Sequence, residues 1–524
     1  MKRFIYILIL FLFAGAAFAA LEVESKMIGR QENVPCIFLR LTVRNPSSQK
    51  LGFDVTLKDS YTNSSILIRN QEISPLKEQV FNLAVPLMKS PLAEVVDSEG
   101  GKTFAASSWD FKIFLNICDI SNFATEKQAT DFSTIYYKTS ANAVSQLEPD
   151  ILPDNWLCYT PFLSVFIRED AYNSLEPPEK EAILQWVDAG GCLIVYGSDQ
   201  NREVNRMLGT IRYQSASPLE LNDLGKKIAW SPWLDQSKTR GSMKDFPYQV
   251  KKSAGKYGGF ILTTAFLIMA GPLNYSFWKK RKRIRMILIT LPVISISFCV
   301  IIILYFIASQ GFAKKGGSVS VTILDENTDT GVTFSRNCLF SGLYPLGGFR
   351  FDRTTGFYPF IQTKDFSIDF TKFLHLKSGI FTPSVNFHYL TAMPFKTRER
   401  FVYDPEEKTI TNGLEQNVEG LLWKEGGQIL VARDIAPGQK KKLEPFPQNG
   451  SASAVPFSHE SFSSEFLSES EAKFGASFLS NFISAPLKDN RVKYIARIKD
   501  NPPSIQTGIK ISAKKNTAFL AGLE

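Results

Sequence analysis

Residues 257–308 read YGGFILTTAFLIMAGPLNYSFW, then KKRKRIR, then MILITLPVISISFCVIIILYFIA. Each apolar run, residues 257–278 and residues 286–308, is long enough to cross about 30 Å of hydrocarbon as a helix. The seven residues between them carry six cations, which are Lys279, Lys280, Arg281, Lys282, Arg283 and Arg285. Short loops rich in lysine and arginine stay in the cytoplasm. The pattern therefore predicts a transmembrane hairpin of two helices joined by a basic cytoplasmic loop, residues 279–285.

The N-terminus predicts a signal peptide, residues 1–19. Lys2 and Arg3 precede an apolar run, and small residues follow in the order Ala17-Phe18-Ala19. A charged region, an apolar region and a cleavage site come in this order in secreted proteins. A retained membrane anchor is the alternative, and both interpretations export the residues that follow. We therefore expect both large regions on the periplasmic or extracellular side of a bacterial inner membrane.

The basic net charge follows from topology. The formal net charge is +9, of which the loop contributes six and Lys2 with Arg3 contribute two, leaving about +1 for the rest of the chain. A chain without a basic surface elsewhere is not expected to bind nucleic acid.

The six cysteines are scattered and contain no C-x-x-C pair. Cys299 lies in the second apolar run, and the other five lie in the predicted external regions. This spacing indicates neither a disulfide scaffold nor a zinc site. Buried thiols are the favoured interpretation, and a single disulfide stays the alternative.

Residues 20–109 alternate short strand-like runs with turn clusters. Leu39, Leu41 and Val43 alternate with polar residues, and the turn cluster from Asn45 to Ser48 follows. Runs with one apolar and one polar face are typical of strands in a β-sandwich. The pattern predicts an N-terminal β-sandwich domain.

Residues 110–240 change to an order of strand, loop, helix and strand. The sequence predicts a helix from Pro177 to Ala189, with two prolines at its start and two glycines after its end. The continuous apolar run from Cys192 to Tyr196 is typical of a strand buried on both faces of a parallel sheet. This order predicts an α/β domain.

Strand-like runs return in residues 316–524 and predict a C-terminal β-sandwich-like domain. Between Gln439 and Ser470, a lysine run, prolines and serines predict a loop or linker. The fold class is therefore a multidomain α+β membrane protein.

No catalytic, metal-binding or cofactor-binding motif is complete. There is no G-x-S-x-G and no G-x-G-x-x-G. Asp325, Asn327 and Asp329 open like a calcium loop, but Arg336 occupies the position of the bidentate glutamate, so we expect an ordinary turn. All three histidines follow the hairpin in sequence, so the α/β domain contains no Cys-His pair. We predict no catalytic residue, no metal and no cofactor.

Four residues are weak candidates for binding a ligand. Ser198 and Asp199 follow the apolar strand, and Asp154 and Glu169 lie near the ends of neighbouring elements. Ligands of open α/β sheets bind at the carboxyl ends of the strands. Solvated turns and helix caps are the alternative interpretation of all four.

The first apolar run contains a helix breaker near its cytoplasmic end. Gly271, Pro272 and Asn274 lie shortly before Trp278 and the basic loop. Proline frees a backbone carbonyl that a neighbouring polar group can satisfy. We expect an interfacial kink that sets the hairpin, with partner binding as the alternative, and the loop cations are expected to contact anionic lipid or a cytoplasmic partner.

The segment LQWVDAGGCLIV at residues 184–195, followed by GPLNY at residues 271–275, resembles a group of uncharacterised bacterial membrane proteins. Their external domain looks like a class I glutamine amidotransferase, and the resemblance covers about residues 151–308. It implies a flavodoxin-like fold for the α/β domain. Amidotransferases of that fold use a cysteine on a sharp elbow with a histidine, and this sequence matches neither, so the resemblance implies a fold without the chemistry.

Three functional hypotheses follow. The first is a non-enzymatic, membrane-anchored envelope protein that binds or scaffolds a protein or glycan partner. The second is an envelope hydrolase, which would need at least two of Asp154, Glu169 and Asp199 within about 10 Å of each other in a cleft. The third is an accessory subunit of an export or transport complex. Because two spans are too few for a transport pathway, a transport role would require oligomerisation or a separate permease.

Overall fold

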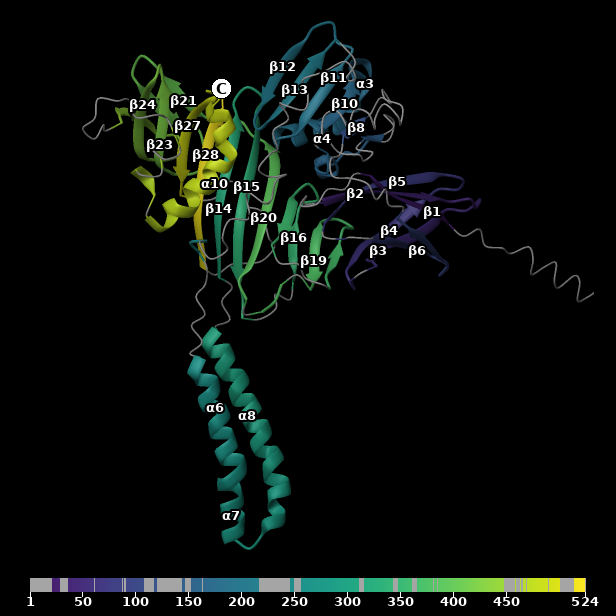
Figure 1. The fold of residues 1–524 in the computed structure, drawn as a ribbon, viewed down its shortest axis with the longest axis vertical. Helices are drawn as coiled ribbons and strands as arrows, with labels where there is room; N and C mark the ends of the chain where they lie inside the picture. The colour runs from purple at the N-terminus through teal and green to yellow at the C-terminus, as the bar shows by residue number, and fades with distance from the viewer. Residues whose placement is uncertain are drawn as a thin grey trace, which may run out of the picture.

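The computed structural model describes most of the chain outside its N-terminus and several connecting segments. The described residues are 21–28, 36–60, 62–86, 88, 91–107, 117–119, 144–146, 152–162, 164–215, 246–248, 256–310, 315–342, 347–360, 365–379, 381–383, 385–446, 458, 462, 465–467, 469–488, 490–499 and 513–523. The predicted signal peptide, residues 1–19, lies outside them. Figure 1 shows a head of several β-sheets from which a helical hairpin projects.

The N-terminal region forms strands as predicted. The buried side chains of Leu39, Leu41 and Val43 alternate with less buried ones, because successive side chains of a strand point to opposite faces. The strands of this region are β1 (Glu22–Ile28), β2 (Cys36–Arg44), β3 (Leu51–Asp59), β4 (Ser65–Ile73), β5 (Glu78–Pro86), β6 (Pro91–Asp97) and β7 (Lys102–Ala106). Strands β1, β2 and β5 form one sheet, while β3, β4, β6 and β7 belong to another.

That second sheet also contains strands from the C-terminal region. Its order is β16-β19-β18-β4-β3-β6-β7, in which β16 (Phe349–Phe351), β18 (Ser367–Asp369) and β19 (Leu374–Ser378) come from beyond the hairpin. Strand β18 pairs in parallel with β4, and Ile368 lies opposite Ile66. The predicted domains 20–109 and 316–524 therefore share one sheet and one hydrophobic core.

A mainly parallel sheet follows in the chain, in the order β12-β13-β11-β10-β8-β9. Only the edge strand β12 is antiparallel to its neighbour. The five residues of β11, predicted as a core strand, are all buried. The strands are β8 (Ile117–Asp119), β9 (Val144–Gln146), β10 (Ser164–Arg168), β11 (Cys192–Tyr196), β12 (Arg202–Arg206) and β13 (Gly209–Gln214).

The helices of this α/β unit are short. A 3₁₀ turn, η2 (Trp156–Tyr159), precedes β10, and α3 (Glu169–Ser174) and α4 (Pro177–Asp188) lie between β10 and β11. Helix α4 is the helix predicted from residue 177. It starts with a capping box in which the side chains of Glu176 and Glu179 satisfy each other's backbone N–H groups.

The largest sheet lies in the C-terminal region and has the order β17-β20-β15-β14-β28-β27-β23-β24-β26. Its strands are β14 (Lys315–Asp325), β15 (Thr330–Phe340), β17 (Gly356–Pro359), β20 (Phe387–Lys396), β23 (Val418–Glu425), β24 (Gln428–Ile435), β26 (Glu444–Pro445), β27 (Val492–Ile498) and β28 (Ala513–Leu523). Strands β21 (Phe401–Asp404), β22 (Thr409–Asn412) and β25 (Lys440–Lys442) form a small separate sheet.

Part of the predicted loop 439–470 is ordered structure. The lysine run forms β25, because it pairs with β22, and helix α10 (Glu469–Lys488) begins where the loop was expected to end. Residues 447–457 of the predicted loop lie outside the described residues. Helix α10 packs its phenylalanines on the largest sheet, where the rings of Phe482 and Phe334 stack with centroids 4.4 Å apart.

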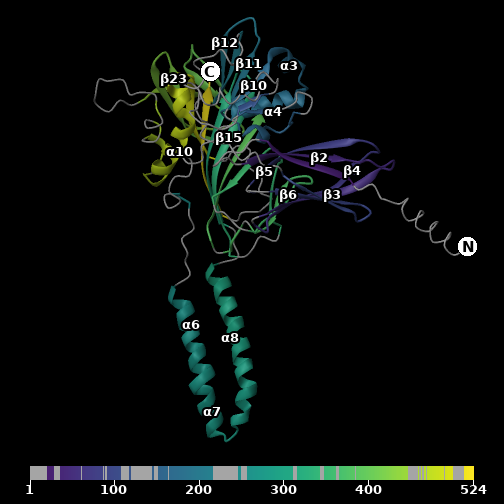
Figure 2. The same ribbon diagram turned by 45° about the vertical axis from the view of Figure 1, so that its right-hand side comes forward.

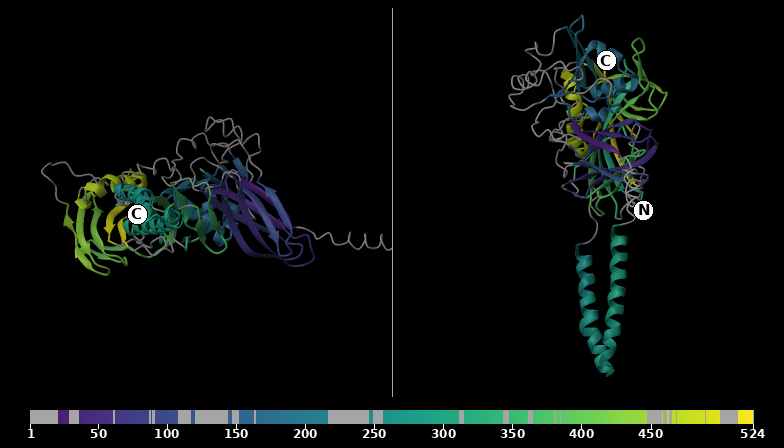
Figure 3. Two further views of the ribbon diagram at one scale, coloured as in Figure 1. Left: turned by 90° about the horizontal axis from the view of Figure 1, so that it is seen from below. Right: turned by 90° about the vertical axis from the view of Figure 1, so that its right-hand side faces the viewer.

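The hairpin consists of α6 (Lys256–Ile268), a π-helical turn η6 (Met269–Leu273), α7 (Asn274–Lys280), a 3₁₀ turn η7 (Ile284–Met286) and α8 (Ile287–Gln310). Two stretches in it, Gly258–Lys280 and Ile284–Tyr305, are long and apolar enough to span a membrane. Compared with the predicted span 257–278, the first helix continues through Lys279 and Lys280. Figure 2 and the right view of Figure 3 show from other sides that the hairpin projects away from the head.

Candidate functional site

The head contains a cleft between the α/β unit and the C-terminal sheet. Helix α4 and the end of β12 form one wall, while the turn between β14 and β15 and the end of β20 form the other. The larger of two cavities in this cleft has a volume of about 520 Å³. A smaller cavity of about 380 Å³ lies beside β12 and β13. Leu184, Arg206 and Thr328 line both cavities, so the two adjoin.

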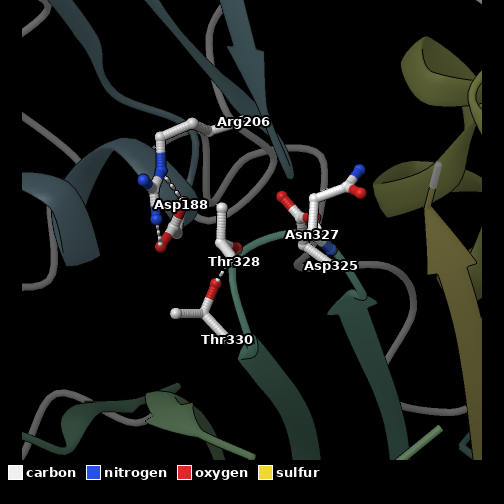
Figure 4. A network of polar contacts seen from close by, with 6 residues as sticks. All are labelled: Asp188, Arg206, Asp325, Asn327, Thr328 and Thr330. Carbon is white, nitrogen blue, oxygen red and sulfur yellow. Dashed lines mark hydrogen bonds and ion pairs between the residues drawn. The ribbon is translucent and has the colours of Figure 1, made fainter. Parts of the chain in front are cut away.

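A bidentate ion pair joins α4 to β12 in this cleft (Figure 4). The Nε of Arg206 lies 2.6 Å from Oδ1 of Asp188, and its Nη2 lies 2.9 Å from Oδ2. The two side chains are 14% and 3% exposed, respectively. A guanidinium and a carboxylate that meet in this way form two parallel, charge-assisted hydrogen bonds. The pair therefore fixes the position of Arg206 between the two cavities.

Burial and pairing shift the pKa values of Asp188 and Arg206 in opposite directions. Burial raises the pKa of the Asp188 carboxyl, and the hydrogen bond from Arg206 offsets only part of that increase. For Arg206, burial lowers the pKa, but the hydrogen bond and charge of Asp188 more than compensate, and the net pKa is raised. The guanidinium of Arg206 therefore remains charged, and the buried carboxylate of Asp188 stabilises that charge.

The opposite wall is a polar turn. Oδ1 of Asp325 accepts a hydrogen bond from the backbone N–H of Asn327 at 2.9 Å, and the hydroxyls of Thr328 and Thr330 lie 2.6 Å apart. Figure 4 shows Thr328 and Thr330 of this turn beside the Asp188–Arg206 pair. The sequence of this turn opens like a calcium loop, but its first carboxylate accepts a hydrogen bond from the backbone of the same turn, as in an Asx turn.

An ion pair spans the cleft at its outer edge. Nζ of Lys396, at the end of β20, lies 2.8 Å from Oε1 of Glu181 on α4. The two side chains are 70% and 42% exposed. Exposed pairs contribute little to stability, so this one adds little to the contact between the two walls.

The structure brings two of the four predicted ligand residues together. Oγ of Ser198 donates a hydrogen bond to Oε1 of Glu169 at 3.1 Å, at the carboxyl ends of β11 and β10. Asp154 and Asp199 are both exposed, and neither contacts this pair through a described hydrogen bond or ion pair. None of the four lines the two cavities. Their role as ligands stays a prediction.

The predicted polar residues of the hairpin cluster near its turn. Oγ1 of Thr290 on α8 donates to Oδ1 of Asn274 at 2.9 Å, and Nε1 of Trp278 donates to Thr290 at 3.2 Å. Pro272 and Gly271 lie in the π-helical turn, which is where an interruption by proline was expected. The guanidinium of Arg281 lies over the ring of Phe277. The hydrogen bonds of Thr290 join the two helices next to the basic residues.

A cysteine and a histidine lie together in the largest sheet, and the sequence did not predict this pair. Cys338 on β15 lies opposite His388 on β20, and Sγ lies 3.8 Å from Nε2. Burial raises the pKa of Cys338 to about 12 and lowers the pKa of His388 to about 4. Both groups are therefore neutral near pH 7, so the thiol is not activated as a nucleophile. The sequence offers no signal for this pair, because it depends on which strands become neighbours.

Comparisons with known proteins find no close relative. The sequence matches no protein-family model, and a search of curated proteins finds no match. Among solved structures it is similar to a cycloisomaltooligosaccharide glucanotransferase from Paenibacillus sp., with 12% identity over 35% of this chain and 33% of that chain and a TM-score of 0.15. A GH20 exo β-N-acetylglucosaminidase from Vibrio harveyi has 9% identity over 29% and 31% of the two chains and a TM-score of 0.12.

A further similar structure is the μ-homology domain of yeast δ-COP-I in complex with a Dsl1 peptide, with 7% identity over 40% of this chain and 96% of that chain and a TM-score of 0.18. The chain spans about a third of the length of the two bacterial enzymes. TM-scores this low carry no argument about fold or activity. The structure itself defines the chain as a β-rich multidomain protein with two helices long and apolar enough to span a membrane.

Proposed function

We propose that this chain is a non-enzymatic binding or scaffold protein, anchored by its hairpin in a bacterial inner membrane, that holds an envelope protein or glycan in its cleft. The observation that carries the proposal is the cleft itself, because α4 with β12 and the β14–β15 turn together build one concave site. Concave sites with mainly apolar walls and a few placed polar groups are typical of ligand binding, and many lie between domains.

The architecture would hold such a partner away from the membrane. Strand β14 begins five residues after α8 ends and runs to Asp325 in the cleft. Its 11 residues span about 35 Å at roughly 3.3 Å per residue. In Figure 1 the α/β unit lies at the end of the head opposite the hairpin. A partner bound there would lie in the envelope space and not at the lipid surface.

The strand order supports a flavodoxin-like fold for the α/β unit. Without the antiparallel edge strand, the order β9-β8-β10-β11-β13 corresponds to 2-1-3-4-5 in chain order, which is the order of flavodoxin-like sheets. The junction from β10 to α3 consists of Arg168 and Glu169 and contains no cysteine, and Cys192 lies within β11, where burial raises the pKa of its thiol. Both features support a domain without amidotransferase chemistry.

Topology is the first part of the proposal to test. Reporters that work only in the periplasm would be fused after Lys252, within residues 279–285, and after Gly317. We expect activity at the first and third positions and none at the second. The reverse pattern would place both large regions in the cytoplasm and would contradict the envelope role.

Site-directed photocrosslinking tests the cleft. A benzoylphenylalanine at Thr328, which lines both cavities, is expected to form an adduct with an envelope component in intact cells. The matched control carries the same group at Val402, which is 57% exposed on β21. If the two positions give the same adducts, or if Thr328 gives none, the cleft is not a binding site.

A further inference from the structure

We propose that the turn of the hairpin is a binding site for the phosphate groups of anionic phospholipids in the cytoplasmic leaflet. This inference rests on the insertion of the hairpin in a membrane, which is part of the proposed function, but it does not depend on the cleft. It selects a lipid over an acidic cytoplasmic protein as the partner of the basic residues. Three observations carry it: the charge of this part of the chain, the backbone of the turn, and the rings on which two cations pack.

The cations of the turn require negative charge from outside the chain. The sequence contains no acidic residue from residue 246 to residue 324. Figure 1 shows the turn at the end of the hairpin farthest from the head, so the carboxylates described in the head are out of reach. Cations clustered next to a span attract anionic lipid headgroups. The exposed cations are Lys279, Lys280, Arg281, Lys282, Arg283 and Arg285.

The backbone of the turn holds these cations next to the two spans. The N–H of Lys282 donates to the carbonyl of Lys279 at 3.1 Å, and the N–H of Arg283 donates to that of residue 278, also at 3.1 Å. Lys282 is left-handed, with a φ of 55°, and the three features form a Schellman motif at the end of α7. Glycine is the usual residue in this position, so the backbone does not require the lysine side chain. Only residues 281–283 separate α7 from η7.

Two of the cations pack on aromatic rings of α7. The guanidinium carbon of Arg281 lies 4.2 Å from the ring centroid of Phe277. Nζ of Lys279 lies 5.6 Å from the ring centroid of Tyr275. Both rings are about half exposed. Tyrosine and tryptophan side chains gather at the level of the lipid headgroups, and Trp278 follows Phe277 in the same helix. We infer that the two cations lie at that level, beside the helix.

This placement favours lipid phosphates over an acidic protein. A cytoplasmic protein approaches from beyond the turn, whereas Arg281 and Lys279 lie beside the rings of α7. Phospholipids surround a membrane helix at this depth and reach both cations. Arginine also forms two parallel hydrogen bonds with a phosphate group. A zwitterionic lipid brings its own cation with the phosphate, so we expect selectivity for lipids with a net negative headgroup.

The lipid selectivity of the full-length protein tests the inference. The protein is reconstituted in nanodiscs of equal parts phosphatidylglycerol and phosphatidylcholine, and native mass spectrometry counts the lipids that stay bound in detergent. We expect phosphatidylglycerol to be enriched. Lys282→Gly keeps the left-handed backbone and removes one charge, so it should lower the enrichment about fivefold, the effect of one cation at a membrane surface.

Lys408→Gly is the matched control, because Lys408 is an exposed residue of the head with a φ of 51°. This variant removes the same charge from the same kind of backbone and is expected to leave the enrichment unchanged. Equal retention of the two lipids by the unchanged protein would overturn the inference, and so would equal effects of the two variants.

Photocrosslinking in intact cells separates a lipid from a protein partner. A benzoylphenylalanine at Ile284, which is 53% exposed within the basic turn, is expected to gain the mass of an anionic phospholipid. The control position is Leu304, which is 58% exposed near the other end of α8 and should gain lipids without this preference. A protein adduct at Ile284, or the same lipid classes at both positions, would overturn the inference. The adducts at Thr328 test the cleft separately, and an active reporter within residues 279–285 would contradict the insertion itself.

Discussion

Asp188 occupies an unfavourable position for a carboxylate, and Arg206 compensates for it. The residue ends α4, where the helix dipole is negative, and only 3% of its side chain is exposed. Arg206 reaches it from β12 with two hydrogen bonds, and both residues belong to the same wall of the cleft. The sequence alone does not predict this ion pair, because the pairing with Arg206 exists only after β12 has folded back beside the helix.

Removing one partner of this ion pair is expected to cost more than removing both. Asp188→Ala leaves Arg206 largely buried without its carboxylate and should destabilise the α/β unit by about 3 kcal/mol. The double variant Asp188→Leu with Arg206→Met replaces the pair by apolar volume and should recover most of that loss. Urea unfolding of the full-length variants, followed by tryptophan fluorescence, measures both. Additive losses in the double variant would contradict a coupled pair.

His388 makes stability depend on pH. Burial, with a smaller contribution from the charge of Arg336, lowers the pKa of His388 to about 4, against about 6.5 in an unfolded chain. Below pH 6.5 the unfolded chain therefore binds a proton that the folded protein does not take up until about pH 4. The stability is fully present above pH 6.5 and falls by at most about 3 kcal/mol as the pH decreases through this window.

Urea unfolding at several pH values between 7.5 and 4 tests this dependence. His388→Gln should be less stable at pH 7.5 but should lose less stability on acidification. His375→Gln is the control, because it removes another histidine that is less buried than His388. Nε2 of His375 lies 3.0 Å from the carbonyl oxygen of Gly347. If His388→Gln and the unchanged protein lose stability in parallel between pH 6.5 and 4, His388 is not the responsible group.

The elements with a strong local pattern were predicted from the sequence, and those that depend on distant partners were not. The apolar run of β11, the prolines at the start of α4 and the alternation in β2 each gave the correct element. Strand β25 was predicted to be part of a loop. Its three lysines have no strand pattern of their own and form a strand only by pairing with β22. The cleft could not be predicted at all, since its walls are more than a hundred residues apart in sequence.

The chain before the hairpin is anchored to the strand that follows it. Phe246 is buried, its ring meets those of His388 and Phe474, and the hydroxyl of Tyr248 bonds with that of Thr517 on β28. Gly317 in β14 admits Tyr248, because a Cβ at this glycine would collide with the Cβ of Tyr248. The two ends of the hairpin are thus held at one place on the largest sheet.

Gly317→Ala is therefore expected to displace Tyr248 and to destabilise this contact by about 1–3 kcal/mol, as overpacking does. The measurement is the rate of limited proteolysis between Tyr248 and α6, which should rise relative to the unchanged protein. Gly347→Ala is the matched control, because a Cβ at that glycine meets nothing within 4 Å. Equal proteolysis of the two variants would mean that the position of Tyr248 does not depend on the absence of a side chain at residue 317.

The N-terminal and C-terminal regions share one sheet and one hydrophobic core. The sequence predicted both regions as β-rich, which the sheets confirm, but nothing in a local pattern shows that β18 pairs with β4 across about 300 residues of chain. The core between them contains Leu57 and Ile66 from one region and Phe349 and Ile368 from the other. The hairpin is inserted between two parts of a shared structure, so the shared sheet requires the chain on both sides of the hairpin.

Residues 21–109 alone are therefore expected not to fold. Without β18 the edge of β4 is open, and the core loses the buried side chains of Phe349 and Ile368. An amide NMR spectrum of the isolated segment should show poor dispersion, and a well-dispersed spectrum would contradict the shared core. In the full-length protein Ile368→Asp, which places a charge at a position with 0% exposure, should make the N-terminal sheets sensitive to protease. Val402→Asp on the exposed strand β21 should not, because its charge remains in water.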